Sequence, residues 1–278
     1  MTTTDTTWPL IELGRNQPVT PSHIRDLLEG RIAAIRIPEA VDPQACAEVV
    51  RRIETRGTSK YPGMREALGT LFPNHWSARY VDGDWDGYFA SVDSTEDVKA
   101  AIFEPLGMPP REVANRLIEP GLGRPVERLR CPQTGRPYHS VIVRAGAAKH
   151  HFDFGGYDLP SNIAPRVMRQ CAWNIYLSAE GAGGELEVFQ TMGTSPGHTK
   201  AKAETLGIRY FGNYDLPAAF VEGAPSVAVA CRTGDFVMIM NRHVHRVRPV
   251  VPTELTERRI AISSHVAEFI DGRFCDFS

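Results

Sequence analysis

The sequence lacks any apolar run that approaches the roughly 18 residues of a membrane-spanning helix. Its first residues, Met1 to Thr7, contain neither a basic segment nor an apolar segment, so we expect no secretory signal. An excess of positive charge is also missing, because 31 Lys and Arg residues are balanced by 33 Asp and Glu residues. Nucleic-acid binding through phosphates needs clustered positive charge, so we expect no nucleic-acid partner. Because a membrane-spanning run is also missing, we expect no membrane partner.

Cysteine is scarce, and its spacing excludes a disulfide framework. The chain has five cysteines, an odd number, and none of them forms a C-x-x-C pair. We therefore expect reduced thiols, mostly small core residues, in a cytoplasmic protein. With 278 residues, 42% hydrophobic and 23% charged, the composition is that of a soluble globular protein that can bury a substantial core. No repeat or linker divides the chain, so we expect a single domain spanning residues 1–278.

The first part of the chain, residues 1–130, is predicted to be helix-rich support. About 20 residues rich in Thr and other polar residues predict a loosely ordered arm, and residues 31–37 predict a strand. A helix is expected to begin at Asp42-Pro43 and to end at Gly57, because Asp is a good N-cap and Pro suits the first helical position.

Two further helices are expected in this part. The capping-box pattern of residues 94–97 predicts the start of one helix. The other is predicted to open at Pro109-Pro110 and to stop at Pro120.

The remaining residues, 131–278, show short strand-like runs that alternate with Gly and Pro turns, which is typical of a β-sandwich or barrel. The predicted strands cover residues 138–144, 171–177, 184–189, 227–230, 236–240, 245–250 and 259–266. Residues 191–215 lack clear periodicity and are interpreted as a lid or binding loop. The predicted fold class is α+β, with helices packed on a β-core.

Nine histidines are present, and most of them need no function. Solvated or structural roles are expected for His23, His75, His139, His198 and His265. The segment His151-Phe-Asp153 is different, because residues i and i+2 of an extended chain point to the same face. A third ligand is available from His243 or His245, and two histidines with one carboxylate form the facial triad of non-haem Fe(II) oxygenases. The alternative for His151 and Asp153 alone is a surface ion pair.

Three segments, in this order, resemble the Fe(II)/2-oxoglutarate-dependent dioxygenases. They are Tyr138–Asp153, which leads into the H-x-D motif, Gly183–Phe189 with its G-G-E-L sequence, and Thr233–Ser263 with its H-R-V and R-R-I-A-I-S sequences. Together they lie within residues 138–266, about half of the chain. The helical first half and the tail Phe274–Ser278 are similar to the stand-alone branch that acts on free small molecules and includes alkaloid hydroxylases and halogenases.

This resemblance implies that His151, Asp153 and His245 bind the metal. The H-R-V context selects His245, and His243 remains the fallback. Arg259 would bind the distal carboxylate of 2-oxoglutarate, which suits the planar and permanently charged guanidinium. Asn174 would add a polar contact to the cosubstrate, or else serve as a structural amide between strands.

Strand parity supports Arg259, because it places this residue on one face with Ala261 and Ser263. The alternative is that this arginine begins a strand and exposes its side chain to solvent. Two features differ from the family pattern. The 14-residue spacing from His245 to Arg259 is long, and Ala261 replaces the family's frequent serine, so that Ser263 is the remaining hydroxyl.

The resemblance further implies a double-stranded β-helix, a jelly-roll or cupin-like core. The expected cofactor is Fe(II), with 2-oxoglutarate and O2 as cosubstrates. The expected reaction is hydroxylation of an aliphatic C–H bond of a small molecule (a free amino acid, an alkaloid or another secondary metabolite), with decarboxylation of 2-oxoglutarate to succinate. Halogenases of this superfamily have Gly or Ala where this chain has Asp153, so halogenation is not expected. Desaturation and cyclisation stay open.

Two other functions stay open as well. One is a cupin-like metalloenzyme, an isomerase or lyase, that does not use 2-oxoglutarate. The other is a non-enzymatic β-module that binds a small ligand. Residues 74–89 combine aromatic side chains with carboxylates, and they either line a pocket for a cationic ligand or pack a loop onto the core.

Overall fold

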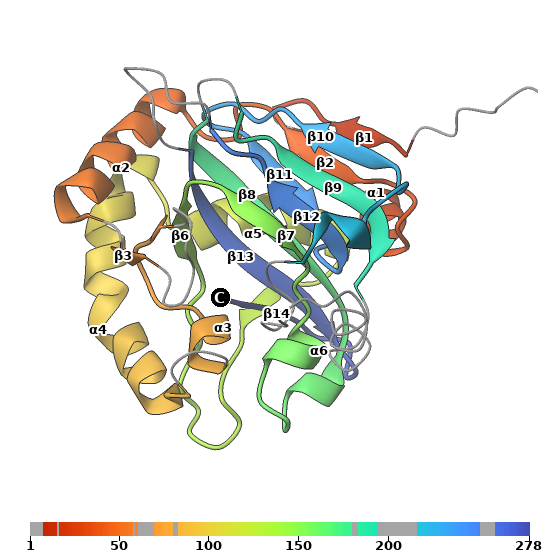
Figure 1. Ribbon diagram of the computed structural model, residues 1–278. Helices are drawn as coiled ribbons and strands as arrows, with labels where there is room; N and C mark the ends of the chain where they lie inside the picture. The colour runs from red at the N-terminus through yellow and green to blue at the C-terminus, as the bar shows by residue number, and fades with distance from the viewer. Residues whose placement is uncertain are drawn as a thin grey trace, which may run out of the picture.

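A computed structural model describes most of the chain (Figure 1). The described residues are 8–15, 17–57, 59–60, 69–79, 83–179, 183–193, 216–250 and 259–278. The α-helices are α1 (Pro21–Leu28), α2 (Pro43–Arg56), α3 (His75–Ser77), α4 (Trp85–Phe103), α5 (Pro110–Leu122) and α6 (Gly155–Asp158). The strands are β1 (Leu10–Glu12), β2 (Ala34–Ile37), β3 (Ser59–Lys60), β4 (Gly69–Thr70), β5 (Val126–Arg128), β6 (Ile142–Ala145), β7 (Ala148–His151), β8 (Val167–Ser178), β9 (Leu186–Met192), β10 (Ser226–Val229), β11 (Phe236–Ile239), β12 (His243–Val247), β13 (Ile260–Phe269) and β14 (Phe274–Phe277).

These described strands form two sheets. The large sheet has the order β1-β2-β11-β8-β13-β6-β4-β3, and β14 and β5 extend it beside β13. The small sheet has the order β10-β9-β12-β7. The prediction of an α+β fold is confirmed, although the first part of the chain also supplies strands to the large sheet and is not only helical support.

One face of the large sheet is covered by helices. Along β8 the side chains of Cys171, Trp173, Ile175 and Leu177 point to this face and belong to one buried cluster with residues of α1, α2, α4 and α5. In Figure 1, α2 and α4 lie beside the large sheet. Alternation with a period of two therefore assigns every second residue of β8 to the main apolar core.

The opposite face, called the inner face below, packs against the small sheet. Ala172 and Tyr176 of β8 and Ala261 of β13 share a buried cluster with Leu186 and Val188 of β9. The polar residues that alternate with the apolar core of the large sheet consequently lie between the two sheets, shielded from solvent.

Helix α2 follows the sequence prediction. Asp42 is its N-cap and accepts a hydrogen bond from the backbone nitrogen of Gln44, and Gly57 is its C-cap residue at φ 77°. A residue other than glycine would be strained in this left-handed region.

Two helix boundaries were predicted wrongly. Helix α4 starts at Trp85, capped by Asp84, whose Oδ1 accepts a hydrogen bond from Gly87 at 2.7 Å. Ser94 lies inside this helix and donates to the carbonyl of Ser91 in the preceding turn, which shows how a capping pattern also occurs in a helix interior. Helix α5 continues through Pro120 and ends only at Gly123, at φ 65°.

The predicted arm is also wrong in part. Residues 10–12 form β1, which pairs in parallel with β2, while residues 1–7 lie outside the described residues. The seven strands predicted between residues 138 and 266 are all found, with shifted ends. Strand β7, which leads into the H-x-D motif, was not predicted as a separate strand. None of the described helices has both the length and the apolar character needed to cross a bilayer.

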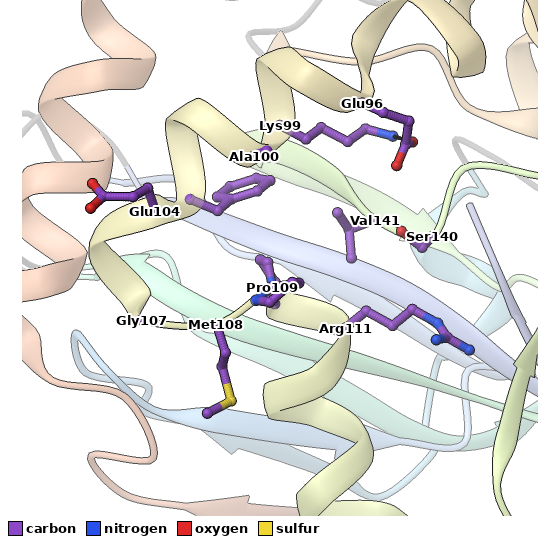
Figure 2. Close-up of a pocket in the computed structure, with 12 residues that line it drawn as sticks. Glu96, Lys99, Ala100, Glu104, Gly107, Met108, Pro109, Arg111, Ser140 and Val141 are labelled. Atoms are coloured by element: carbon purple, nitrogen blue, oxygen red, sulfur yellow. Dashed lines mark hydrogen bonds and ion pairs between the residues drawn. The ribbon is translucent and has the colours of Figure 1, made fainter.

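A pocket of about 350 Å³ lies on the helix side of the sheet, between α4 and α5, and Lys99 and Arg111 are among the residues that line it. Figure 2 shows Lys99 reaching from α4 toward Glu96, and their side chains approach to 3.1 Å. Behind the pocket wall, the Lys99 Nζ atom lies 2.5 Å from Nδ1 of His139, and Oγ of Ser91 lies 3.0 Å from Nε2. His139 therefore has a structural role, as expected from the sequence.

This arrangement predicts how stability depends on pH. Burial, reinforced by the charges of Lys99 and Arg128, lowers the pKa of His139 to about 2. Below the unfolded pKa of about 6.5 the unfolded chain takes up a proton at this site and the folded chain does not, so stability falls as pH falls. We expect His139→Gln to reduce the slope of the unfolding free energy between pH 6 and 5 by about 1.4 kcal/mol per pH unit.

Urea denaturation at pH 7.5, 6 and 5 measures this slope, with His23→Gln as the control for loss of a histidine outside the core. Equal slopes in the wild type and in His139→Gln would contradict the prediction.

Candidate functional site

The site begins with a cross-strand pair of histidines in the small sheet. His151 is the last residue of β7, and His245 lies opposite it on the antiparallel strand β12. Their ring centroids are 4.2 Å apart, with an interplanar angle of 53°. Asp153 follows β7 by two residues, and its backbone nitrogen donates to the carbonyl of Asn241 at 2.8 Å. This bond joins the H-x-D segment to the turn that follows β11 of the large sheet.

Three potential ligand atoms converge here. Oδ2 of Asp153 lies 4.0 Å from Nε2 of His151 and 3.6 Å from Nε2 of His245. Potential ligand atoms of the three residues all lie within 4.8 Å of one another. Two atoms that bind one transition metal at about 2.1 Å are at most about 4.2 Å apart, so both distances to Asp153 suit a shared ion.

Both imidazoles are oriented by backbone carbonyls. Nδ1 of His151 lies 2.6 Å from the carbonyl oxygen of Lys149, and Nδ1 of His245 lies 2.9 Å from that of His243. A carbonyl oxygen can only accept a hydrogen bond, so each Nδ1 carries the proton and donates. In the neutral ring this donation leaves the lone pair on Nε2, the nitrogen that faces Asp153, which is the arrangement commonly found around metal-ligating histidines.

The electrostatics keep His151 and Asp153 in the protonation states that metal binding requires. Burial, reinforced by His245, lowers the pKa of His151 to about 3, so this ring is neutral at pH 7. Burial raises the pKa of Asp153, but its interactions with His245, His151 and His265 outweigh that effect and hold the pKa well below the usual value. Two neutral imidazoles and one carboxylate suit a divalent ion with open positions.

The fallback ligand, His243, lies outside this cluster. The register of β12 against β9 shifts between His243 and His245. The His243 ring contacts Trp8 edge to face, with ring centroids 5.0 Å apart. The structure therefore brings together His151, Asp153 and His245, the three residues selected from the sequence.

Arg259 enters the inner face just before β13 and is buried, with 5% exposure. A terminal guanidinium nitrogen donates to the hydroxyl of Tyr176 at 3.2 Å, and the guanidinium lies 4.9 Å from the centre of that ring. Among the described residues no carboxylate pairs with Arg259, and its Nε has no hydrogen-bond partner. The solvated alternative for this arginine is wrong, since its side chain is buried.

The G-G-E-L turn forms the wall beside Arg259. Gly183 has φ 92° and bridges Val250, and a Cβ atom there would lie 2.0 Å from the carbonyl oxygen of Pro249. A Cβ on Gly184 would meet Arg259 itself, at 3.6 Å from its Cβ. Glycine is therefore required at position 183 for the two chain segments to approach this closely.

Asn174 and Ser263 lie opposite each other on β8 and β13. The Ser263 hydroxyl donates to Oδ1 of Asn174 at 2.5 Å, and both side chains are buried. The register places this pair between the Tyr176–Ala261 pair on one side and the Ala172–His265 pair on the other. Polar groups consequently follow one another along the inner face from Arg259 toward Asp153.

Three residues near Asp153 were not assigned to the site from the sequence; His75 and His265, for which solvated or structural roles were expected, are both buried. His265 of β13 accepts a hydrogen bond from Asn241, with 2.9 Å between Nδ1 and Nδ2. The ring of His75, on α3, stands perpendicular to that of His265, with centroids 5.5 Å apart. His265 could have been placed from the sequence, because it alternates along β13 on the same face as Arg259 and Ser263. The sequence carries no such indication for His75, because its position depends on tertiary packing.

Residues 74–89 were expected either to line a ligand pocket or to pack a loop onto the core, and different parts of the segment fit each interpretation. His75 lies beside His265, whereas Trp85, Tyr88 and Phe89 pack with Tyr138 in a separate aromatic cluster. The aromatic residues of α4 therefore hold a segment onto the core and do not form a ligand cage. Most of the lid predicted for residues 191–215 lies outside the described residues, as does His198.

Comparison with solved structures identifies the fold. An N-substituted L-amino acid dioxygenase from Burkholderia ambifaria superposes with a TM-score of 0.56 and 12% identity, over 94% of this chain and 92% of that chain. Its complex with alpha-ketoglutarate gives a TM-score of 0.56 and 13% identity, over 93% and 91%. The carbocyclase SnoK from nogalamycin biosynthesis is matched at a TM-score of 0.48 and 15% identity, over 92% and 90%.

No protein-family model matches the sequence, and the curated proteins contain no match either. The resemblance to Fe(II)/2-oxoglutarate-dependent dioxygenases noted in the sequence is thus confirmed at the level of the fold.

The burial of Arg259 predicts a stability cost in the ligand-free protein. A buried cation that lacks a carboxylate partner is poorly compensated for its lost hydration. We expect Arg259→Met to raise the free energy of unfolding by about 1–3 kcal/mol, since the apolar side chain has a similar length. Urea denaturation without added ligands measures the change, with the exposed Arg169→Met as control. A less stable Arg259→Met protein would show that Arg259 is a structural residue.

Proposed function

We propose that this protein is an Fe(II)/2-oxoglutarate-dependent oxygenase that hydroxylates an aliphatic C–H bond of a small molecule. The observation that carries the proposal is the convergence of His151, Asp153 and His245, with Nε2 of both rings directed at the carboxylate. Arg259, a buried arginine with no carboxylate partner in the described part of the chain, lies on the same inner face.

The donor set fits the proposed metal. Two neutral imidazoles and one carboxylate leave three positions of an octahedron free, the pattern of non-haem Fe(II) oxygenases. In this proposal His151, Asp153 and His245 hold Fe(II), and the carbonyls of Lys149 and His243 keep the two rings in the ligating tautomer. Iron with 2-oxoglutarate and O2 would supply the oxidation of an unactivated C–H bond.

The residues of the large sheet would hold the cosubstrate. Arg259 offers a fixed fork of N–H donors to the distal carboxylate of 2-oxoglutarate, and Tyr176 orients that fork. Asn174 and Ser263 lie in register between Arg259 and His265, so they would contact the cosubstrate along its length. Because these groups are buried, they would exclude water from the cosubstrate and strengthen its ion pair with Arg259.

The two facing sheets fit the double-stranded β-helix that the sequence suggested. We infer that the large and small sheets are its two walls and that residues 1–278 act as one domain, since strands and helices from 1–130 are part of the same large sheet and core. The fold neighbour named as an N-substituted L-amino acid dioxygenase supports a small-molecule substrate such as an amino acid, an alkaloid or another secondary metabolite. Asp153 occupies the ligand position that halogenation would need free.

Anaerobic titration of the metal-free protein with Fe(II) and then 2-oxoglutarate tests the proposal. We expect one Fe(II) per chain and, after 2-oxoglutarate, a visible metal-to-ligand charge-transfer band from the chelated keto acid. His151→Ala is expected to lose the metal, whereas His243→Ala, a buried histidine outside the cluster, should keep it. Arg259→Ala is expected to keep the metal and to raise the Kd for 2-oxoglutarate about 100-fold, because it removes a buried charged pair.

The outcomes separate the alternatives. Iron binding without the band would favour a cupin-like enzyme that does not use 2-oxoglutarate. Equal metal content in the wild type and in His151→Ala would favour the non-enzymatic binding module. If His243→Ala loses the metal and His245→Ala keeps it, the ligand assignment is wrong.

A further inference from the structure

The inner face has a second polar end, away from Arg259. Along β13, Arg259 and His265 are separated by six residues, so their Cα atoms are about 20 Å apart. His265, Asn241 and His75 are buried at this end and come from β13, the turn that follows β11 and α3. The backbone nitrogen of Asp153 bonds the carbonyl of Asn241 at 2.8 Å, and its negative charge acts on both histidines. With 2-oxoglutarate extending toward Arg259, this end is left for the substrate.

Asn241 presents an acceptor here. Its Nδ2 donates to Nδ1 of His265 at 2.9 Å, since an amide nitrogen can only donate. Its Oδ1 is buried and has no hydrogen-bond partner among the described residues. A buried amide oxygen without a partner is costly, which indicates that a ligand group or water completes it.

His75 presents a second acceptor. The ring interacts with the backbone of Ser278, and its buried Nδ1 has no hydrogen-bond partner among the described residues. Because Nδ1 has no such partner, we assign the contact with the Ser278 backbone to Nε2, which then carries the proton and donates it to a backbone oxygen. Burial lowers the pKa of His75 to about 4, so the ring is neutral at pH 7 and Nδ1 carries a lone pair.

The local charge disfavours a cation at these acceptors. Arg144 lies opposite Ala261 in the sheet, on the inner face, and its positive charge acts on His75 and His265. The charge of Asp153, which opposes this effect, would be neutralised by a bound metal. A neutral group that donates a hydrogen bond is therefore the best match to two acceptors in this place.

We propose that Nδ1 of His75 and Oδ1 of Asn241 receive a neutral hydrogen-bond donor of the substrate, an amide N–H or a hydroxyl, and hold it beside Asp153. This inference rests on the proposed function, since it assigns the substrate class of the same site. Compounds whose donor is replaced by an ester oxygen or a methyl ether would leave both acceptors buried without a partner, and the site would reject them.

The test uses the intact protein loaded with Fe(II) and 2-oxoglutarate under anaerobic conditions. The probes are two matched pairs: N-acetyl-L-leucine with 2-acetoxy-4-methylpentanoate, and 2-hydroxy-4-methylpentanoate with 2-methoxy-4-methylpentanoate. Perturbation of the charge-transfer band gives the Kd of each probe. In at least one pair, the donor compound is expected to bind about 10-fold or more tightly than its blocked partner. The pair that shows this preference distinguishes an amide N–H from a hydroxyl.

The variant His75→Phe keeps an aromatic ring against His265 and Phe277 but removes the acceptor. We expect it to keep the band and to reduce the preference for the donor compound to less than about 3-fold. His75→Gln, whose amide oxygen supplies an acceptor, is expected to restore part of the preference. His139→Phe is the matched control, a buried histidine outside the site, and should keep the full preference.

An undiminished preference in His75→Phe would overturn this inference. So would equal binding within both pairs, or a band that no donor compound perturbs. If His75→Phe itself loses the band, the same ratio is measured in Asn241→Leu, where an undiminished preference again overturns it. Absence of the band in the wild type is a different result, because it refutes the proposed function itself.

Discussion

The antiparallel pairing of β8 with β13 is the constraint on which the rest of this structure depends. The two strands pair from Ile260 to Phe269, and they separate two kinds of environment. One face carries Trp173, Ile175 and Ile262 into the core beneath the helices, and the other carries Asn174 and Ser263 between the sheets. A slip of one residue in either strand would exchange these faces, so the apolar core fixes the register and the register aligns the polar groups of the site.

This arrangement makes the site unfavourable for the stability of the fold, and apolar burial on the helix side of the sheet offsets that loss. The inner face buries a cation at Arg259 and histidines whose lowered pKa values keep them neutral, including His75 and His265. Such groups lose hydration without full compensation by partners. The opposite face carries the large apolar side chains of the same strands, and their burial against α1, α2, α4 and α5 offsets this cost. Stability and chemistry are thus divided between the two faces of one sheet.

The sequence predicted those features that depend on local period and short spacing. The parity of β13 was sufficient to place Arg259 with Ser263, and the H-x-D spacing was sufficient to pair His151 with Asp153. Local sequence patterns did not predict a helix boundary correctly where several positions could start or end the helix. Ser94 has the chemistry of an N-cap but lies in a helix that Asp84 had already started, and Pro120 is tolerated inside α5, which ends only at Gly123.

The two ends of the inner face therefore differ in how they are specified. The end at Arg259 is formed by alternate residues of two paired strands. A sequence that keeps these residues and the register of the pair therefore also keeps their arrangement. The other end requires α3 to pack His75 against His265 and Phe277, and nothing in the period of residues 74–79 encodes that contact. Substitutions in this short segment change the surroundings of Asp153 without altering the pairing of β8 with β13. The residues proposed to bind the metal and the cosubstrate can thus stay unchanged while the proposed contacts to the substrate change.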